Sequence, residues 1–573
     1  MMVFPLMVLM TAIHPGAQAQ YFGRNKPKYE GFNFKVVQTP NYEVYHYLEN
    51  EAYLRTLIAE AEQWYQMHQQ VFKDTIIGKN PILFYNDHAD FQQTTAISGE
   101  IGVGTGGVTE AFKNRVIMPI STSNQQTSHV LGHELVHAFQ YNLILQGDST
   151  NIRNLANLPL WMVEGLAEYL SIGSEDAHTA MWMRDAVLNN KFPSLQDLNN
   201  PSFFPYRYGQ AFWAFVTGLF GDDIIIPLFQ NTAKYGLETA CVVTLGTTLD
   251  NLSNIWQNGM IRYYADQMGL PTDSTVEKTK KKGEVVTVKL SSKIDGISPF
   301  GKKLIDDENA GNMNISPVVS PNGQYVIFLS EKNLFTTDLF LADARTGKII
   351  RNIASTAKDG HIDDFNFIES AGTWSRDSKQ FAFVGIKKGD NVLIIKNVEN
   401  GRTVKELSPK ELPSFSNPAW SPNGKMIVVS GLVNGQIDLY GIDPKTGKVT
   451  QLTDDRYSEL QPSWSPDGNQ LLFATDELSM ERGRTRGRWV TNIAVMDIVS
   501  GRVEHLPVFP GADNLNPVMN TEGQILFLSN RDGYRNLYRY EPETGKVFQM
   551  TKLLTGVSGI TPYSPAISVD RSE

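Results

Sequence analysis

The stretch SHVLGHELVHAFQY, residues 128–141, decides the fold of the first half of this chain because it fits a single buried helix. A helix turns about 100° per residue, so His133 and His137, four residues apart, project from one face, and Glu134 leans toward the same site. Thr127 or Ser128 can cap the N-terminus of this helix. The apolar positions that suit it to burial are Val130, Leu131, Leu135, Val136, Phe139 and Leu143.

Two imidazoles on one helical face can chelate a zinc ion. A neighbouring carboxylate that is not itself a ligand can take a proton from water at the metal and deliver it to a leaving amine. These are the parts of a zinc peptidase, with Glu134 as the base. The competing interpretation is that His133 and His137 are buried core histidines with no metal between them.

A tetrahedral zinc site needs a third protein ligand and an open position for water. The metzincin spacing fails here, because Gln140 stands where glycine is required and Leu143 where histidine is required. The downstream stretch LWMVEGLAEYL, residues 160–170, instead offers Glu164 and Glu168 on one face of a second apolar helix. Buried acids are costly unless they are paired or coordinated, which argues against a purely structural role.

HELVH followed by WMVEGLAEY resembles the gluzincin (peptidase MA-like) family. The resemblance implies a zincin-like, α-helix-rich peptidase domain with Zn²⁺ as cofactor and Glu164 as the third ligand. It makes Glu168 the candidate second-shell group that orients a zinc histidine, whereas the alternative is an exposed helix carboxylate.

The stretch PYRYGQAFWAF, residues 205–215, resembles the Y-x-x-G-x-x-F stretch of the same family. The resemblance implies that Tyr206 hydrogen-bonds the developing oxyanion, with Tyr208 as the second choice. The alternative is an aromatic helix start that packs into the core.

A glycine-rich loop at residues 101–107 lacks the Lys-Ser/Thr that a phosphate-binding loop needs, so we expect it only to lead into a strand at 115–119. In gluzincins the strand before the zinc helix is an edge that pairs with an extended substrate, which is the interpretation for residues 107–118; the alternative is an ordinary edge strand of the core sheet. Of the aminopeptidase motif G-x-M-E-N only Glu110 is matched besides the glycine, which weakens a dedicated aminopeptidase assignment.

Length and composition limit the class of protein. With 573 residues, 41% of them hydrophobic, the chain is too long for one core, and two or three domains are expected. The net charge of −10 disfavours nucleic acid as a partner. The single cysteine, Cys241, excludes an internal disulfide.

The N-terminus predicts export. An apolar run at residues 3–13 ends in the A-x-A pattern of Ala17 to Ala19, so residues 1–19 are predicted to be a cleaved signal peptide. No later segment is expected to cross a membrane. The predicted location is the periplasm, the cell envelope or the medium.

The second half of the chain is repetitive. The turns SPNG at 320–323, WSRDS at 374–378, WSPNG at 420–424, WSPDG at 464–468 and NTEG at 520–523 recur at roughly 45 to 55 residues and precede alternating strands. They resemble the TolB-type (WD40-like) β-propeller. We expect about six blades, the sixth beginning at Pro565 and truncated; the alternative is that Val285–Lys289 completes the ring.

The predicted fold is therefore multidomain α+β: a gluzincin-like domain at 30–270, a charged linker at 271–295 and an all-β propeller at 296–573. Arg482, Arg484, Arg486 and Arg488 are expected in a solvated hairpin extension, with an anion or acidic-peptide contact as the alternative.

The predicted function is that of an exported zinc peptidase that hydrolyses peptides or proteins, while the propeller binds substrate or a protein partner. The alternative is a catalytically inactive, propeller-based scaffold protein of the cell envelope.

Overall fold

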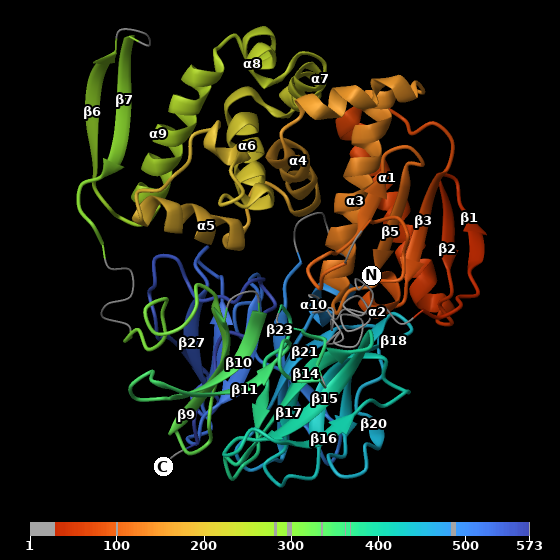
Figure 1. Cartoon of the computed structure of the whole chain (residues 1–573), viewed down its shortest axis with the longest axis vertical. Helices are drawn as coiled ribbons and strands as arrows, with labels where there is room; N and C mark the ends of the chain where they lie inside the picture. The colour runs from red at the N-terminus through yellow and green to blue at the C-terminus, as the bar shows by residue number, and fades with distance from the viewer. Residues whose placement is uncertain are drawn as a thin grey trace, which may run out of the picture.

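The computed structural model describes residues 29–98, 101–279, 283–294, 301–333, 336–360, 362–366, 368–482 and 489–571. A helix-rich domain (the helical domain, residues 29–294) stands on a β-propeller (the propeller, residues 301–571), as Figure 1 shows. This arrangement confirms the prediction of a helix-rich region followed by a propeller. The predicted signal peptide at 1–19 lies outside the described residues.

The helical domain begins with a five-stranded sheet in the order β1-β2-β3-β5-β4. β2 pairs with β3 and β3 with β5 in parallel, whereas β4 runs antiparallel to β5 and forms an edge of the sheet. The edge strand therefore lies beside the helix that follows β5. The strands are β1 (Lys35–Gln38), β2 (Tyr42–His46), β3 (Asn80–Tyr85), β4 (Val108–Glu110) and β5 (Arg115–Pro119).

Helices make up the rest of this domain. The central helix α3 (Asn124–Leu145) begins where the Ser123 side chain accepts a hydrogen bond from the Gln126 N–H, and it ends at Gln146 in the left-handed region. The other α-helices are α1 (Glu51–Phe72), α2 (His88–Phe91), α4 (Leu160–Ile172), α5 (Ala177–Leu188), α6 (Pro205–Phe220), α7 (Ile225–Tyr235), α8 (Leu237–Ala240) and α9 (Leu249–Gln267). Shorter helical turns are η1 (Ser149–Asn157), η2 (Asp197–Asn199), η3 (Asp222–Ile224) and η4 (Cys241–Leu245).

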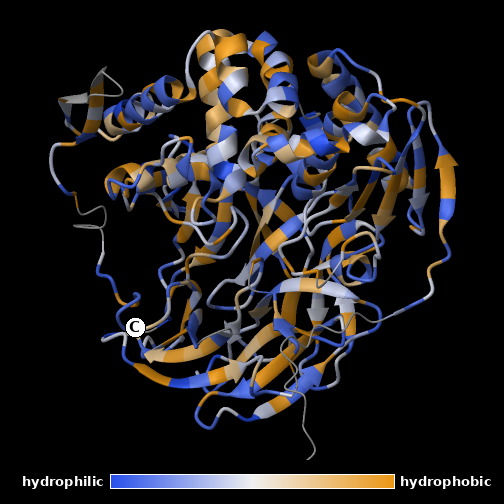
Figure 2. Ribbon diagram, turned by 45° about the horizontal axis from the view of Figure 1, so that its top comes forward, coloured by the Kyte–Doolittle hydropathy of each residue, from blue (hydrophilic) through white to orange (hydrophobic). Residues whose placement is uncertain are grey.

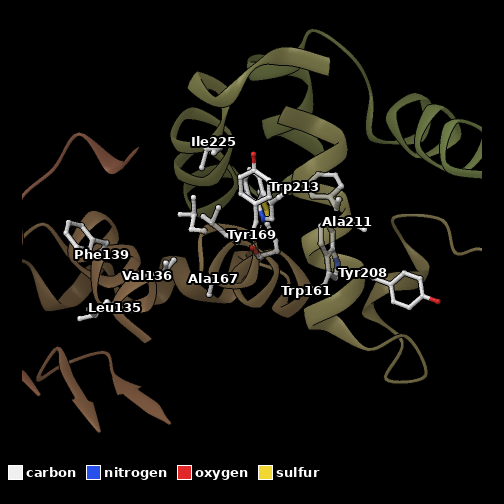
Figure 3. Close-up of a cluster of buried hydrophobic side chains, with 14 of the residues drawn as sticks. Leu135, Val136, Phe139, Trp161, Ala167, Tyr169, Tyr208, Ala211, Trp213 and Ile225 are labelled. Atoms are coloured by element: carbon white, nitrogen blue, oxygen red, sulfur yellow. Dashed lines mark hydrogen bonds between the residues drawn. The ribbon is translucent and has the colours of Figure 1, made fainter. Parts of the chain in front are cut away.

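One hydrophobic core joins α3, α4 and α6. Figure 3 shows Val136 on the side of α3 toward Ala167 of α4, with Trp161 and Trp213 beyond it. Phe139 lies on the opposite side of α3, where it packs against Tyr65 and Phe72 of α1. Trp161 and Trp213 are both at most 1% exposed, and each buries area worth about 2 to 3 kcal/mol of hydrophobic stabilisation. This core fixes the relative positions of the three helices that carry the predicted site residues.

Residues 271–295 differ from the predicted linker. β6 (Thr272–Thr279) and β7 (Gly283–Leu290) form an antiparallel hairpin. Asn258 of α9 holds β7 by donating to Val286 O and accepting from Val288 N. The stretch VVTV after Gly283 has the β-branched composition of a strand, which the linker prediction did not weigh against the neighbouring lysines. The hairpin also places Val285–Lys289 outside the propeller.

The propeller has five blades among the residues described, not about six; four of them have four strands and blade 2 has five. Blade 1 holds β8 (Asn314–Val319), β9 (Tyr325–Asn333), β10 (Thr336–Asp343) and β11 (Ile349–Ser355). Blade 2 holds β13 (Thr373–Trp374), β14 (Gln380–Lys387), β15 (Asp390–Asn397) and β16 (Thr403–Leu407), with β12 (Asp364–Phe365) also paired to β14.

Blades 3 to 5 repeat the pattern. Blade 3 holds β17 (Ser414–Trp420), β18 (Ile427–Val433), β19 (Gln436–Ile442) and β20 (Val449–Gln451). Blade 4 holds β21 (Glu459–Trp464), β22 (Gln470–Thr475), β23 (Asn492–Asp497) and β24 (Val503–His505), with helix α10 (Glu477–Arg482) after β22. Blade 5 holds β25 (Asn514–Met519), β26 (Ile525–Ser529), β27 (Asn536–Glu541) and β28 (Lys546–Gln549). The predicted arginine-rich extension falls largely on residues 483–488, outside the described residues.

The segment Ser564 to Arg571 contains the predicted start of a sixth blade at Pro565, but it forms no strand. Asn516 Oδ1 of blade 5 accepts from the N–H groups of Ala566 and Ile567, and Val319 N of blade 1 donates to Ser568 Oγ at 3.1 Å. Side-chain acceptors thus replace the regular backbone ladder that a strand would need. The segment lies instead along the inner strands of the five blades.

The two domains share buried surface. Figure 2 shows hydrophobic residues along both the helices and the propeller strands. The core of the helical domain continues into the propeller through Leu432, Ile437, Leu460, Ala474 and Leu515. The interface is therefore a packed contact rather than a loose tether.

Within the described part of the chain, no individual helix is both long and apolar enough to span a membrane, although the pair Pro205–Phe220 and Asp222–Tyr235, bent by 115°, passes that test jointly.

Candidate metal centre

Three of the predicted ligands converge in the structure. His133 Nε2 lies 3.2 Å from His137 Nε2 and 3.2 Å from Glu164 Oε2, and His137 Nε2 lies 3.3 Å from the same oxygen. Ligands held about 2.0 to 2.2 Å from a tetrahedral zinc ion are separated by roughly 3.3 to 3.5 Å. The three atoms therefore form one nearly equilateral face of such a site, drawn from α3 and α4.

The other nitrogen of each ring faces an oxygen acceptor. His133 Nδ1 lies 3.1 Å from Glu168 Oε1, and His137 Nδ1 lies 2.8 Å from Gln140 Oε1. A proton on each Nδ1 leaves both Nε2 lone pairs pointing at each other and at Glu164. Three acceptors facing one another repel unless a cation lies between them, so this donor set fits a divalent metal.

The electrostatics of the cluster agree with that description. Burial disfavours the charged imidazole, but Glu164 and Glu168 outweigh burial and raise the pKa of His133 to about 10. Burial also disfavours the charged carboxylate, but His137 and His133 outweigh it and lower the pKa of Glu164. The three groups together therefore favour a bound positive charge.

Glu168 belongs to a buried chain of charges behind His133. It is 4% exposed; its Oε1 also lies 3.2 Å from His129 Nε2, and its Oε2 accepts from Arg207 Nη1 at 3.2 Å. Arg207 Nη1 lies 3.6 Å from Asp176 Oδ1 in turn. The structure thus places Glu168 where it can orient His133, not on an exposed helix surface.

Glu134 lies on the same helix between the two histidines and is held from the edge strand. Thr109 Oγ1 of β4 donates to Glu134 Oε2 at 2.7 Å. A Cβ added to Gly107 would come within 2.9 Å of Glu134 Cγ and 3.0 Å of Oε1. The backbone at residue 107 therefore approaches the Glu134 carboxylate more closely than any residue with a side chain would allow.

The two candidate tyrosines lie in different surroundings. The ring of Tyr206 stacks on His133 with centroids 5.7 Å apart, and burial followed by the charges of Glu164 and Glu134 raises the pKa of its hydroxyl. Tyr208 packs edge-on against Phe203 in the core, and burial raises its pKa to about 12. Only Tyr206 therefore lies at the cluster, and Tyr208 matches the core-packing alternative.

Two glycines align the carboxylate and tyrosine helices. A Cβ on Gly165 of α4 would lie 2.2 Å from Gly209 C, and a Cβ on Gly209 of α6 would lie 1.9 Å from Trp161 O. Helices α4 and α6 therefore touch backbone to backbone one residue after Glu164 and three residues after Tyr206. Trp213 Nε1 adds a hydrogen bond of 2.9 Å to Met162 O across the same crossing.

The cluster opens into a cavity of about 620 Å³ between the two domains. The helical domain contributes His133, Glu134 and Tyr206, and the propeller contributes Trp489, Arg535 and Tyr563. A site of this size is in the usual range for small-molecule and peptide pockets, about 300 to 1,000 Å³.

Some residues at the site were missed by sequence reasoning. Gln140 counted only as a departure from another motif, yet it holds His137 and donates to Val163 O at 3.0 Å. Its position three residues after His137, on the same helical face, is a signal that could have been used. Thr109 and Arg207 gave no such signal, because the sheet and α6 bring them to the site from distant parts of the sequence.

Comparisons with known proteins concern the propeller. The family described as "TolB beta propeller domain" (PD40) matches residues 362–482, which span blades 2 and 3 and part of blade 4. The Tol-Pal system protein TolB of Francisella tularensis subsp. holarctica is 30% identical over 124 residues, 22% of this chain and 26% of that protein. An uncharacterised protein of Agrobacterium fabrum is 27% identical over 181 residues, 31% of this chain and 57% of that protein.

Solved structures are more distant. TolB from Acinetobacter baumannii has a TM-score of 0.34 at 15% identity, covering 53% of this chain and 70% of that chain. A putative TolB from Agrobacterium tumefaciens has a TM-score of 0.32 at 18% identity, covering 42% and 81%. Structural similarity this low carries no argument about function.

The second half of the chain is a β-propeller of four- and five-stranded blades. More particularly, it is a TolB-type β-propeller domain. The chain matches only about a quarter of the length of the TolB relatives from Francisella.

Proposed function

We propose that this protein is a zinc-dependent peptidase of the gluzincin (peptidase MA-like) type, whose TolB-type propeller helps to bind the substrate or a partner. The observation that carries the proposal is the triangle of His133 Nε2, His137 Nε2 and Glu164 Oε2 at 3.2 to 3.3 Å. Both imidazoles direct Nε2 toward the centre of that triangle, and Glu134 lies beside it without belonging to it.

In the proposed reaction the zinc ion, when bound, would polarise a peptide carbonyl and lower the pKa of water in its open position to about 7. Glu134 then takes a proton from the attacking water and passes it to the leaving amine. Thr109 fixes the direction of the Glu134 carboxylate through its hydrogen bond. Tyr206 directs its hydroxyl toward the cluster, where it can donate to the oxyanion of the tetrahedral intermediate.

The remaining residues position these groups. Gln140 and Glu168 hold the Nδ1 sides of His137 and His133, which keeps both Nε2 atoms directed at the metal. Arg207 neutralises Glu168, so the buried carboxylate does not stand as an uncompensated charge.

The test compares the wild-type protein with Glu134→Gln in a digest of a peptide library, with zinc content measured in parallel. Both proteins are expected to hold about one zinc ion per chain. Hydrolysis by the variant is expected to fall by a factor of roughly 10² to 10⁴. Equal hydrolysis by pure samples of the two proteins would contradict the role of Glu134, and absence of zinc from wild type would contradict the metal site.

A second candidate function is a binding or scaffold protein of the cell envelope. It is favoured by the similarity of the propeller to TolB proteins, because propellers generally supply binding surfaces rather than chemistry. Under this proposal the zinc-loaded protein hydrolyses no peptide in the library, while immobilised wild type and Glu134→Gln capture the same protein from an envelope fraction.

Export is part of both proposals. Residues 1–19 have the pattern of a cleaved signal peptide, and an exported protein meets peptide substrates or envelope partners outside the cytoplasm. N-terminal sequencing of protein recovered from the periplasm or the medium tests this, with Gln20 expected as the first residue.

A further inference from the structure

We propose that the space between the two domains is a groove for an extended polypeptide chain and that folded proteins are excluded from it. The inference deepens the proposed peptidase function by naming its substrate class. It concerns binding, however, and can be tested even if no bond is cleaved.

The first argument is the position of the cavity. Its floor includes His133 of α3, Glu168 of α4 and Tyr206 of α6. Its roof is formed by residues of the propeller, among them Gly511, Asp513 and Arg535. A folded domain of 100 residues has a radius of gyration of about 13 Å, so it cannot enter a cavity of about 620 Å³. An extended segment of a few residues can.

The second argument is that the roof is fixed on the side of α1 and α3. Ser458 Oγ of the propeller accepts from Asn124 N at 2.8 Å, and Glu369 Oε2 accepts from Thr122 Oγ1 at 2.8 Å. Asn50, the N-cap of α1, donates to Gln436 Oε1 at 3.3 Å. These contacts involve blades 2, 3 and 4.

The roof is also fixed on the side of α5 and α9. Arg184 of α5 is 1% exposed, donates to Gly533 O at 3.2 Å and lies 4.1 Å above the ring of Tyr534 in blade 5. The hydroxyl of Tyr534 donates to Gln267 O at 2.8 Å, and His178 Nε2 donates to Ile560 O at 3.2 Å. Figure 1 shows α1 and α3 on the right and α5 on the left above the same propeller.

Because both flanks are attached, the propeller cannot swing open about one of them without breaking buried contacts at the other. Leaving the buried Asn124 N–H or the Arg184 guanidinium without its acceptor is unfavourable, so wide opening is costly. The roof therefore limits the thickness of what reaches the metal cluster.

The third argument concerns the axis of the propeller. The segment Ser564 to Arg571 lies along the inner strands, with Arg571 N donating to Pro321 O at 2.9 Å and Arg571 Nη2 to Trp464 O at 3.1 Å. Just before it, Tyr563 O accepts from Gln461 Nε2 at 2.6 Å. The segment therefore fills part of the space between these strands and leaves a cavity of only about 160 Å³ there, so the proposed route for a substrate is from the side, between the domains.

The test measures binding to zinc-loaded Glu134→Gln, which retains the groove. The probes are ribonuclease A labelled with a fluorophore, in its native form and in a reduced and alkylated, unfolded form, followed by fluorescence anisotropy. The unfolded probe is expected to bind at least about tenfold more tightly than the native one. Equal affinity for the two forms would overturn the inference.

A pair of glycine variants, each made in the Glu134→Gln background, locates the binding. Gly511 lines the cavity and Gly218 of α6 lies outside its lining; a Cβ at either position meets no atom within 4 Å, and neither glycine has positive φ. Gly511→Trp is expected to weaken binding of the unfolded probe at least about tenfold, and Gly218→Trp to leave it unchanged. Equal binding by both variants, with matching melting temperatures, would contradict the groove.

Hydrolysis by the wild-type protein separates the two proposals. Selective binding of the unfolded probe without hydrolysis would refute the peptidase and leave the groove standing. Hydrolysis of both probe forms at similar rates would support the peptidase and refute the exclusion of folded proteins.

Discussion

The backbone N–H of Asn124, the first residue of α3, donates a hydrogen bond of 2.8 Å to Oγ of Ser458 in the propeller. The first N–H groups of a helix have no partner within the helix, so the propeller completes the N-terminus of the helix that carries His133, Glu134 and His137. The two domains are therefore linked at the start of the predicted metal-binding helix.

Replacing Ser458 by Ala should lower the stability of the protein by about 0.5 to 2 kcal/mol, because a buried helix N–H loses its acceptor. The melting temperature in the zinc-loaded state measures the effect, and Ser174→Ala at an exposed serine is the matched control. An unchanged melting temperature in both variants would contradict the capping role.

Replacing Gln140 by Leu should weaken zinc binding by about 10- to 100-fold, because His137 Nδ1 loses the oxygen that orients the ring. Competition with a zinc chelator measures the affinity. Gln66→Leu on the exposed face of α1 is the control and should bind zinc as wild type does. Equal zinc affinities for the two variants would contradict the role of Gln140 in orienting His137.

Replacing Tyr206 by Phe should reduce kcat by about 10² to 10³ with zinc content unchanged, since the oxyanion loses a hydrogen-bond donor. Tyr208→Phe is the matched control, because Tyr208 packs in the core against Phe203. If both variants lose activity equally, the hydroxyl of Tyr206 has no special role.

Replacing Gly107 by Ala should lower kcat/KM about 10- to 100-fold. The new methyl group would lie only 2.9 Å from Glu134 Cγ and would therefore push the Glu134 side chain out of position. Gly102→Ala lies in the same loop, where a Cβ meets no atom within 4 Å, and should remain fully active. Steady-state kinetics at equal zinc content distinguish the two, and similar activity would contradict the close approach.

Replacing Asp438 by Asn should flatten the pH dependence of propeller stability between about pH 4 and 7. Burial raises the pKa of Asp438 to about 7, whereas an unfolded aspartate titrates near about 3.9. In that window the folded state binds more protons than the unfolded state, so the stability of wild type falls as pH rises.

The urea midpoint across this pH range is the measurement for Asp438. Asp443→Asn is the control with opposite sign, because hydrogen bonds from Thr446 lower the pKa of that exposed carboxyl. A wild-type profile that rises from pH 4 to 7 through the propeller transition would refute the argument.

The placement of His133 and His137 on one face follows from local periodicity alone, which is why the sequence was sufficient for that pair. Glu164 was assigned as a ligand only through the family resemblance, because it lies 27 residues after His137, on a different helix. Thr109, Arg207 and the propeller contacts at Ser458 could not be inferred. They depend on which strand lies at the sheet edge and on how two domains dock, and neither is encoded in a local pattern.

The propeller, too, could be predicted only in part from the sequence. The WSPDG-like turns predicted the blades, because each turn ends on a residue with positive φ, which is a glycine in four of them and Ser378 in the fifth. The number of blades was wrong, since Pro565 to Asp570 has strand-like composition but forms no strand. It donates to the Asn516 side chain of blade 5, and its Ser568 side chain accepts from Val319 N of blade 1. Composition alone does not say whether a strand will find a backbone ladder.

The contact of Gly165 with Gly209 divides the site into two rigid bodies. Glu164 and Tyr206 belong to helices that meet without intervening side chains, whereas the two imidazoles belong to α3. A cation bound by all three donors would link α3 to α4, so the rigidity of the helical domain would depend on whether the metal is bound. Any side chain at residue 165 or 209 would push the two helices apart and move the Glu164 carboxylate away from the imidazoles. Metal binding would then weaken although the new side chain does not contact the metal.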